Sequence, residues 1–301
     1  MAILVDENTK VLVQGITGRE ATTFTLSMLE CGTPVLAGVT PGKGGQSVYG
    51  VPVYNTVKEA MAAHPEINAT IVSVPPAFTR DAVMEAVDSG IKFISVFTER
   101  VPRGDVCQMI EYARMHGARI VGPNSLGMAS PGKGKLGAIG GPAEEFRKAY
   151  LPGNVAILSR SGGMLTETAN LLALNGIGIS TAINIGGDPI IGSTFVELLP
   201  LLAEDPETKV IVLFCEPGTS SEERMAEWVK EVGYPKPIVA FVTGRFVDDM
   251  PGMRFGHAAV IVEGNTGSAR GKIKAMRDVG ITVVETHDQI ATAVKRLLRE
   301  V

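Results

Sequence analysis

The stretch Val11-Leu-Val-Gln-Gly-Ile-Thr-Gly-Arg-Glu-Ala21 begins as a short apolar strand and passes through two glycines into a helical pattern that runs to Cys31. The next apolar strand pattern, Val35 to Val39, completes a strand–helix–strand unit. Units of this kind pair their strands in parallel through right-handed crossovers. The stretch therefore predicts an α/β fold with a doubly wound sheet.

Strand and helix patterns continue to alternate in two series along the chain. The first series has strand patterns at 70–74, 93–96 and 120–121, and helical patterns at 79–89 and 105–116. The second has strand patterns at 155–158, 179–184, 210–215, 238–242 and 281–284, and helical patterns at 164–175, 194–203, 221–232, 268–277 and 288–300. Many glycines and prolines predict a connection at 131–153, in which 143–150 favours a short helix. We therefore predict a Rossmann-like domain at 1–130 and a flavodoxin-like domain at 154–301.

The composition excludes several classes of protein. A chain of 301 residues, 45% hydrophobic and 20% charged, with a net charge of −4, is typical of a globular α/β protein and not of one that binds nucleic acid or a membrane surface. The N-terminus lacks the pattern of a signal peptide, and no apolar run approaches the roughly 20 residues of a membrane-spanning helix. We therefore expect a cytoplasmic protein. Cys31, Cys107 and Cys215 are far apart, which predicts three small buried thiols and neither a disulfide framework nor a metal cluster.

In open parallel sheets, ligands bind beyond the carboxyl ends of the strands, so the turns after the strands are the candidate sites. A dinucleotide fingerprint would place glycines at 15, 17 and 20, but this chain has Thr17 and Glu20 there. The acid expected after the second strand is also missing, and Thr40-Pro-Gly-Lys-Gly-Gly45 stands in its place. The ammonium group of Lys43 favours a phosphorylated nucleotide such as coenzyme A over NAD. The alternative is a structural glycine turn with a solvated lysine.

Two turns of the second series carry candidate phosphate chemistry. Ser159-Arg-Ser-Gly-Gly-Met164 leads from a strand directly into a helix, and the free N–H groups and dipole of a helix N-terminus attract anions. Ser161 is equally suited to a helix cap alone. Glu216 ends the strand pattern 210–215 and therefore lies at the same edge of the sheet.

His257 is the candidate nucleophile. It lies in Arg254-Phe-Gly-His-Ala-Ala259, after a loop at 243–253 and before the apolar run 260–262, and its small neighbours leave the imidazole accessible. A carboxylate such as Glu216 against one ring nitrogen leaves the other free to attack phosphorus. The alternatives are a surface histidine and a surface glutamate. Gly267-Ser-Ala-Arg-Gly-Lys272 departs from the nucleotide triphosphate motif, so a partner subunit is expected to supply the triphosphate site.

Seven motifs together resemble the alpha subunit of succinyl-CoA synthetase over essentially the full length of the chain. They are Gly15-Ile-Thr-Gly18, Gly38-Val-Thr-Pro-Gly-Lys-Gly-Gly45, Gly122-Pro-Asn124, Ser159-Arg-Ser-Gly162, Ile185-Gly-Gly-Asp-Pro189, Gly192-Ser-Thr-Phe195 and Gly256-His-Ala258. Each motif is weak alone, but their order and spacing are specific. The chain thus resembles an alpha subunit of the NDP-forming acid–CoA ligases.

The resemblance implies a Rossmann-like domain that binds coenzyme A and a flavodoxin-like domain with a phosphohistidine loop. It implies His257 as the phosphohistidine, Glu216 as its partner, and Ser161, Gly162 and Gly163 as phosphate ligands. The residues that it places at coenzyme A are Thr17, Gly18, Arg19, Glu20, Lys43, Phe97, Thr98 and Glu99. It implies a ligase of the tricarboxylic acid cycle, in a hetero-oligomer with a beta subunit whose ATP-grasp domain holds ATP or GTP with Mg²⁺. We assign no metal ligands to this chain.

Two departures from the family pattern leave the acid open. Thr166 stands where the family has a tyrosine near the acid, and Asn124-Ser-Leu-Gly127 replaces the family's Asn-Cys-Pro-Gly. Asn124, Ser125 and Thr166 are therefore the candidate acid-binding residues, and similarity to ATP citrate lyase and citryl-CoA synthetase makes citrate or malate a competitor of succinate. A CoA-responsive binding protein without catalysis is an alternative of another class. An NAD dehydrogenase is disfavoured by Thr17.

Overall fold

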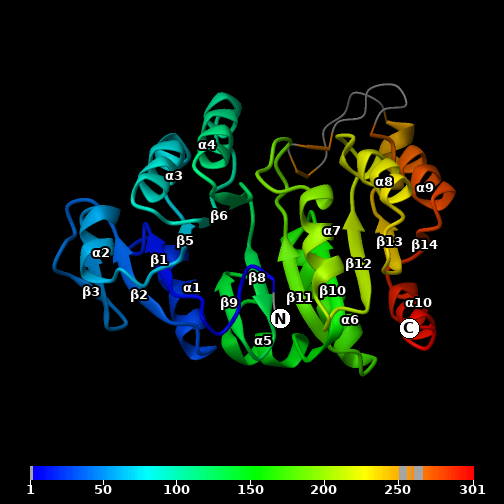
Figure 1. Cartoon of the computed structure of the whole chain (residues 1–301), viewed down its shortest axis with the longest axis horizontal. Helices are drawn as coiled ribbons and strands as arrows, with labels where there is room; N and C mark the ends of the chain where they lie inside the picture. Colours follow the sequence, from blue (N-terminus) through cyan, green and yellow to red (C-terminus); the bar gives the residue numbers. More distant parts are fainter. Residues whose placement is uncertain (1–2, 251–255, 258, 261–266) are drawn as a thin grey trace.

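The computed structural model describes residues 3–250, 256–257, 259–260 and 267–301. Arg254, Phe255 and Ala258 of the histidine stretch, and most of the run 260–262, therefore lie outside the described residues. Two seven-stranded sheets lie side by side, which confirms the α/β fold with two halves (Figure 1). No helix in the described ranges is long and apolar enough to span a membrane.

The first sheet has the strand order β3-β4-β2-β1-β5-β6-β7. All neighbours pair in parallel except β3 and β4. Without β3, this is the Rossmann order, in which the chain changes direction between β1 and β5. Its strands are β1 (Val11–Gln14), β2 (Val35–Val39), β3 (Ser47–Val48), β4 (Val51–Tyr54), β5 (Ala69–Val72), β6 (Phe93–Val96) and β7 (Arg119–Val121). Its helices are α1 (Arg19–Glu30), α2 (Val57–Ala63), η1 (Pro76–Phe78), α3 (Thr79–Asp88) and α4 (Arg103–Met115).

The second sheet has the order β14-β13-β12-β10-β11-β8-β9, and its five strands from β10 to β14 are parallel in the flavodoxin order. The chain changes direction between β10 and β12. Its strands are β8 (Gly127–Ser130), β9 (Gly134–Gly137), β10 (Pro152–Ser159), β11 (Ile179–Asn184), β12 (Val210–Cys215), β13 (Ile238–Val242) and β14 (Thr282–Val284). Its helices are α5 (Ala143–Ala149), α6 (Gly162–Leu174), α7 (Phe195–Glu204), α8 (Ser221–Val232), η2 (Arg245–Asp249), α9 (Ala269–Asp278) and α10 (Gln289–Leu297).

Helices cover both faces of each sheet because successive strand side chains point to opposite faces. In β1, Val11 and Val13 pack with α1, whereas Leu12 packs with α2, α3 and α4. In β12, Ile211 packs with α7, α8 and α9, whereas Val212 packs with α6 and α10. Neither strand therefore has a face toward solvent, which explains why both are apolar apart from the buried Gln14.

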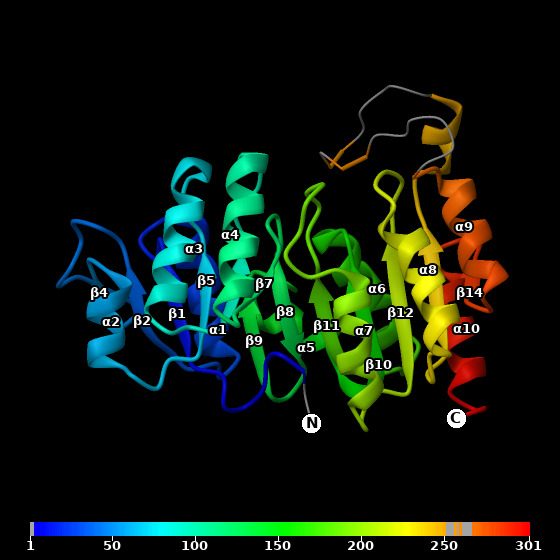
Figure 2. The same ribbon diagram turned by 45° about the horizontal axis from the view of Figure 1, so that its top comes forward.

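The structure contains elements that the sequence patterns did not predict. The strands β3 and β4 and the helix α2 lie in 47–63, and an antiparallel hairpin of β8 and β9 pairs with β11. Figure 2 shows this hairpin in the middle of the molecule, between the two series of strands. The division between the sheets thus falls after β7, and the range 131–153 contains β9, α5 and the start of β10. The domain limits at 130 and 153 stay a prediction.

The prediction of three buried thiols was wrong for two of them. Cys215 is buried, Cys31 is intermediate and Cys107 is exposed. Cys107 lies on the outer face of α4, whose buried residues are Val106, Met109, Ile110 and Ala113.

Candidate active site

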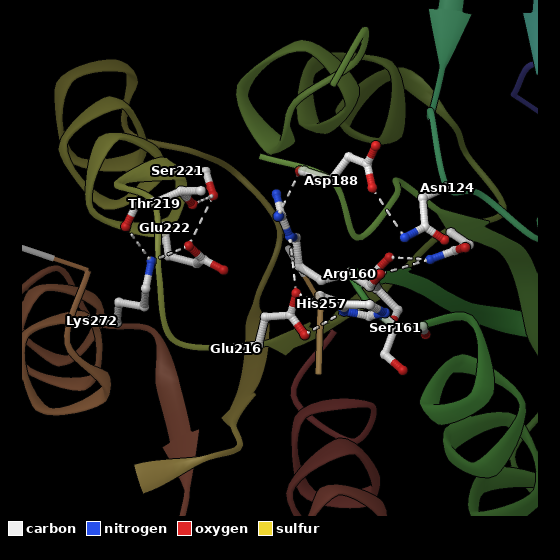
Figure 3. Close-up of polar contacts among 12 residues, drawn as sticks. Asn124, Arg160, Ser161, Asp188, Glu216, Thr219, Ser221, Glu222, His257 and Lys272 are labelled. Atoms are coloured by element: carbon white, nitrogen blue, oxygen red, sulfur yellow. Dashed lines mark hydrogen bonds and ion pairs between the residues drawn. The ribbon is translucent and has the colours of Figure 1, made fainter. Parts of the chain in front are cut away.

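His257 and Glu216 form a direct contact at the carboxyl end of the second sheet (Figure 3). Glu216 directly follows β12, and its carboxylate oxygens lie 2.9 and 3.0 Å from Nδ1 of His257. Only 8% of the Glu216 side chain is exposed, whereas 30% of the imidazole is exposed. The carboxylate is therefore held inside the protein while the ring reaches solvent.

The geometry distinguishes the two ring nitrogens of His257. A carboxylate accepts hydrogen bonds, so Nδ1 carries the hydrogen that it donates to Glu216, and in the neutral ring Nε2 keeps its lone pair. The ring lies against the backbone of Gly187, where a Cβ would stand 2.7 Å from Cδ2 and 2.8 Å from Nε2. A glycine at 187 is thus required for the imidazole to occupy this position.

Arg160 and Asp188 extend the site behind the pair. Arg160 is 2% exposed, its Nε lies 3.7 Å from Oε1 of Glu216, and its Nη2 donates to the carbonyl of Asp188 at 3.1 Å. The hydrogen bond to Glu216 raises the pKa of His257 above 6.5, although burial and Arg160 act in the opposite direction. Burial likewise raises the pKa of Asp188, against the hydrogen bond from Asn124. The imidazole therefore lies among two acids and one buried cation.

The N-terminus of α6 lies at the same end of the sheet, because β10 and β12 are neighbours. Ser161 caps the helix, and its Oγ accepts from the N–H of Met164 at 3.4 Å. The N–H groups of Gly162 and Gly163 belong to the first turn, which has no acceptors within the helix. The cap and the anion site are thus compatible, because the side chain of Ser161 serves Met164 and leaves these N–H groups available.

Asn184 holds the turn that precedes α6. Its Nδ2 donates to the carbonyls of Ser159 and Arg160 at 3.0 and 3.1 Å, and its Oδ1 accepts from the N–H of Leu126 at 2.7 Å. Ser125 donates to the carbonyl of Asn184 at 2.5 Å and is 1% exposed. Ser125 therefore has a structural contact, and its assignment to the acid stays a prediction.

The other two candidate acid-binding residues, Asn124 and Thr166, contact different parts of the structure. Asn124 donates from Nδ2 to Asp188 at 3.2 Å, which brings it to the edge of the site around His257. The hydroxyl of Thr166 lies 3.1 Å from that of Tyr150, a buried residue that directly follows α5. Thr166 thus points toward α5, and a tyrosine hydroxyl reaches it from there.

The candidate coenzyme A residues lie at the carboxyl edge of the first sheet. Thr17 follows β1, Lys43 follows β2, and Phe97, Thr98 and Glu99 follow β6. Gly18 caps α1, and Arg19 and Glu20 begin it, with exposed side chains 3.2 Å apart.

Among these residues, Lys43 is exposed in an ordered turn, whereas Thr98 is buried. Lys43 is exposed, in a turn whose N–H groups of Gly42 and Gly44 donate to Oδ1 of Asn55 at 2.9 and 3.0 Å. Thr98 is buried and donates to the carbonyl of Val74. The turn of Lys43 is therefore ordered by Asn55, a residue that the sequence analysis did not single out.

A cavity of about 270 Å³ lies beside the imidazole, lined by Glu216, His257, Pro217, Thr243, Phe246 and Val260 among others. A larger cavity of about 560 Å³ lies between η2 and α9, and neither Glu216 nor His257 lines it. Its basic residues Arg245, Arg270, Lys274 and Arg277 are all paired with carboxylates. The smaller cavity is therefore the one that belongs to the candidate chemistry.

Arg160, Gly187 and Asp188 had no role in the sequence analysis. All three lie within quoted motifs, Ser159-Arg-Ser-Gly162 and Ile185-Gly-Gly-Asp-Pro189. The sequence signals that could have pointed to them are an arginine at the end of a strand pattern and two glycines directly before an acid.

The chain matches two family models, a CoA binding domain at residues 6–100 and a CoA-ligase at residues 158–282. It is 47% identical over 298 residues to the ADP-forming succinate–CoA ligase subunit alpha 2 of Archaeoglobus fulgidus, covering 99% of this chain and 100% of that one. It is 41% identical to the malate–CoA ligase subunit alpha of Methylorubrum extorquens, covering 99% of each.

Among solved structures, the chain is similar to ATP citrate lyase from Methanothrix soehngenii in complex with citrate and coenzyme A. The TM-score is 0.92 and the identity 28%, over 99% of this chain and 51% of that one, so this chain spans about half of its length. The family models lie on the two halves that carry the candidate residues, and the curated relatives match from end to end. The chain belongs to the family of alpha subunits of ADP-forming carboxylic acid–CoA ligases.

Proposed function

We propose that this chain is the alpha subunit of an NDP-forming acid–CoA ligase that makes a CoA thioester through a phosphohistidine at His257. The observation that carries the proposal is the contact of Glu216 with Nδ1 of His257, which leaves Nε2 as the nucleophile. A ring that is partly exposed and rests on Gly187 is accessible to a phosphoryl donor and acceptor.

The proposed reaction proceeds in three steps. Nε2 of His257 attacks the terminal phosphorus of ATP or GTP, and the nucleoside diphosphate leaves. A carboxylate oxygen of the acid then takes the phosphoryl group from Nε2, and the resulting acyl phosphate loses phosphate when the CoA thiol attacks its carbonyl carbon. Glu216 stabilises the protonated Nδ1 side of the ring while Nε2 carries the phosphoryl group. The first-turn N–H groups of Gly162 and Gly163, with Ser161, are suited to the phosphoryl charge in transit.

For coenzyme A, the proposed site is the carboxyl edge of the first sheet, formed by Thr17, Gly18, Arg19, Glu20, Lys43, Phe97, Thr98 and Glu99. The exposed ammonium of Lys43 and the dipole at the start of α1 are suited to phosphate groups. The N–H of Asn124 donates to the carbonyl of Thr98 at 2.9 Å, and its side chain donates to Asp188. A ligand at Thr98 and Glu99 would therefore lie close to the site around His257.

The proposed sites for the nucleotide and Mg²⁺ belong to a partner subunit. Relatives named as alpha subunits imply a partner subunit. We propose a beta subunit whose ATP-grasp domain holds ATP or GTP with Mg²⁺, in a hetero-oligomer located in the cytoplasm.

The proposed acid is succinate, with malate and citrate as the alternatives. Succinate is the acid named for several relatives, whereas malate and citrate occur in the names of a relative and of a structural neighbour. Thr166, with Tyr150 against it, is the feature that favours an acid other than succinate, because a tyrosine hydroxyl at this point comes from the α5 side and not from α6. Asn124 and Ser125 complete the proposed acid site.

The function is tested with the chain co-purified with its beta subunit. CoA, ATP or GTP, and one of succinate, malate, citrate or acetate are supplied, and the acyl-CoA product is identified by chromatography. We expect one acid to give a thioester with release of nucleoside diphosphate, and His257→Asn to give none. Coenzyme A binding without product for any acid would instead support the CoA-responsive binding protein.

A further inference from the structure

A second buried polar cluster lies beside the Glu216–His257 pair, at the same end of the sheet (Figure 3). Its centre is Lys272 in α9 and Glu222 in α8, whose side chains are 0% and 1% exposed. The ammonium of Lys272 donates to Glu222, and to Glu223 at 3.0 Å. Burial opposes the charge on Lys272, but the two carboxylates outweigh it and raise the pKa of the lysine. The cluster is therefore a buried ion pair in which the lysine is charged.

A further contact of Lys272 holds the turn that carries Glu216. Its Nζ donates to the carbonyl of Thr219 at 3.1 Å. Thr219 adopts a φ of 52°, a left-handed conformation that is unfavourable for a β-branched residue and persists only where its surroundings hold it. Because Glu216 lies three residues earlier in the same turn, the contact restricts where its carboxylate can lie.

The same turn is joined to the segment that follows His257 in the chain. The N–H of Gly218 donates to the carbonyl of Gly267 at 2.8 Å. Gly267 has a φ of 73°, and a Cβ there would stand 2.6 Å from the carbonyl oxygen of Thr219. Lys272 follows Gly267 in the first turns of α9 and reaches back to this point. Lys272 thus connects the segment that carries the acid with the segment that continues from the histidine.

We propose that Lys272 is a positioning residue for the Glu216–His257 pair: by bonding Thr219 and Glu222, it fixes the turn 216–220 against the start of α9. No contact between Lys272 and His257 occurs among the described residues, so its action is through the backbone. Without the ammonium, the carbonyl of Thr219 loses this donor, and the turn that carries Glu216 is held less firmly beside Nδ1. The effect of Lys272 on phosphorylation rests on the proposed function, whereas its effect on the position of the Glu216 carboxylate does not.

The experiment distinguishes a positioning role of Lys272 from a contribution to the stability of the fold alone. Removing Lys272 alone would leave the charge of Glu222 buried and unpaired, which endangers folding. The double variant Lys272→Met/Glu222→Leu replaces the buried ion pair with apolar side chains and removes the donor to Thr219, and such replacements often keep or raise stability. It also removes the lysine partner of Glu223, whose side chain is 23% exposed. Lys272→Arg is a second variant, which keeps the charge pair but changes the position of the donors. Lys274→Met, on the same helix with a side chain 77% exposed, is the matched control.

Three measurements are made on each full-length variant: the melting temperature, the pKa of His257 by NMR, and the rate of phosphorylation from ATP or GTP with the beta subunit. We expect the double variant to melt close to the wild type. Its His257 pKa should fall toward that of Glu216→Gln, and its phosphorylation should slow by about tenfold or more. Lys272→Arg should shift the pKa in the same direction, and Lys274→Met should match the wild type.

Folded Lys272 variants with the wild-type His257 pKa and phosphorylation rate would overturn the positioning role. If the double variant fails to fold, the same comparison is made with Lys272→Arg. Failure of the proposed function would look different, because the wild type would then remain unphosphorylated while the His257 pKa still responded to Lys272.

Discussion

Lys135 is a buried cation whose effect on stability should depend strongly on pH. It lies in β9 with no exposed surface, and its Nζ donates to Oγ of Ser27 at 2.6 Å and to the carbonyl of Gly141 at 2.8 Å. The ring of Phe146 lies 4.9 Å from the same nitrogen. Burial lowers the pKa of Lys135 from 10.5 to about 8. Substitution with methionine keeps the length of the side chain and removes the charge.

The sign of the effect follows from proton binding. Below pH 8 the lysine is protonated in both the folded and the unfolded chain, so its contribution is constant. Between pH 8 and 10.5 the unfolded chain keeps the proton that the folded chain has lost, so the stability of the wild type rises with pH. A difference of 2.5 in pKa corresponds to about 3 kcal/mol over the full range.

The assay compares urea unfolding of the wild type and Lys135→Met at pH 7 and at pH 9.5. Whatever the difference in the free energy of unfolding at pH 7, that of the wild type should increase by about 2 kcal/mol relative to that of the variant between pH 7 and pH 9.5. The control is Lys274→Met, at an exposed lysine, whose difference from the wild type should not change. Parallel stability curves for the wild type and Lys135→Met would refute the reasoning, since they would mean that the buried lysine titrates like a free one.

Three further predictions concern the site. Glu216→Gln should lower the pKa of His257 toward 6.5 in an NMR titration, because the hydrogen bond that raises it is weakened; an unchanged value would mean that Glu216 is not its main partner. Gly187→Ala should slow phosphorylation by about 10²-fold with little change in melting temperature, because its Cβ displaces the imidazole; a normal rate would contradict the close contact. Asn184→Ala should reduce the free energy of unfolding by about 2–4 kcal/mol in urea, because buried carbonyls of Ser159 and Arg160 lose a donor.

Much of the fold was predictable because its central strands are buried on both faces. The pattern at 210–215 is apolar throughout and that at 11–14 is apolar apart from Gln14, and the observed strands have the same limits. The strands β3 and β4 could not be found in this way because both are short and lie among turns. No residue of β3 is buried, and β4 alternates between buried and partly exposed residues. The hairpin of β8 and β9 was missed because its glycines and Lys135 are typical of a loop, and the charge is buried by tertiary contacts with Ser27, Gly141 and Phe146.

The positions of Glu216 and of the turn before α6 were predictable because they depend only on where two neighbouring strands end. Glu216 directly follows a strand, and a phosphate-type turn follows the neighbouring strand, so their meeting at one edge follows from parallel pairing. The close approach of Gly187 to His257 depends on how the loop after β11 packs, which no local pattern contains. The contact of Thr166 with Tyr150 likewise depends on the packing of α5 against α6.

The central claim is that Nε2 of His257 carries the phosphoryl group during turnover. The most direct measurement incubates the chain and its beta subunit with ATP or GTP and locates the modification by mass spectrometry under conditions that preserve phosphohistidine. The account predicts one acid-labile phosphoryl group on His257, absent from His257→Asn and removed when CoA and the proper acid are added. A phosphoryl group on another residue, or full turnover by His257→Asn, would contradict it.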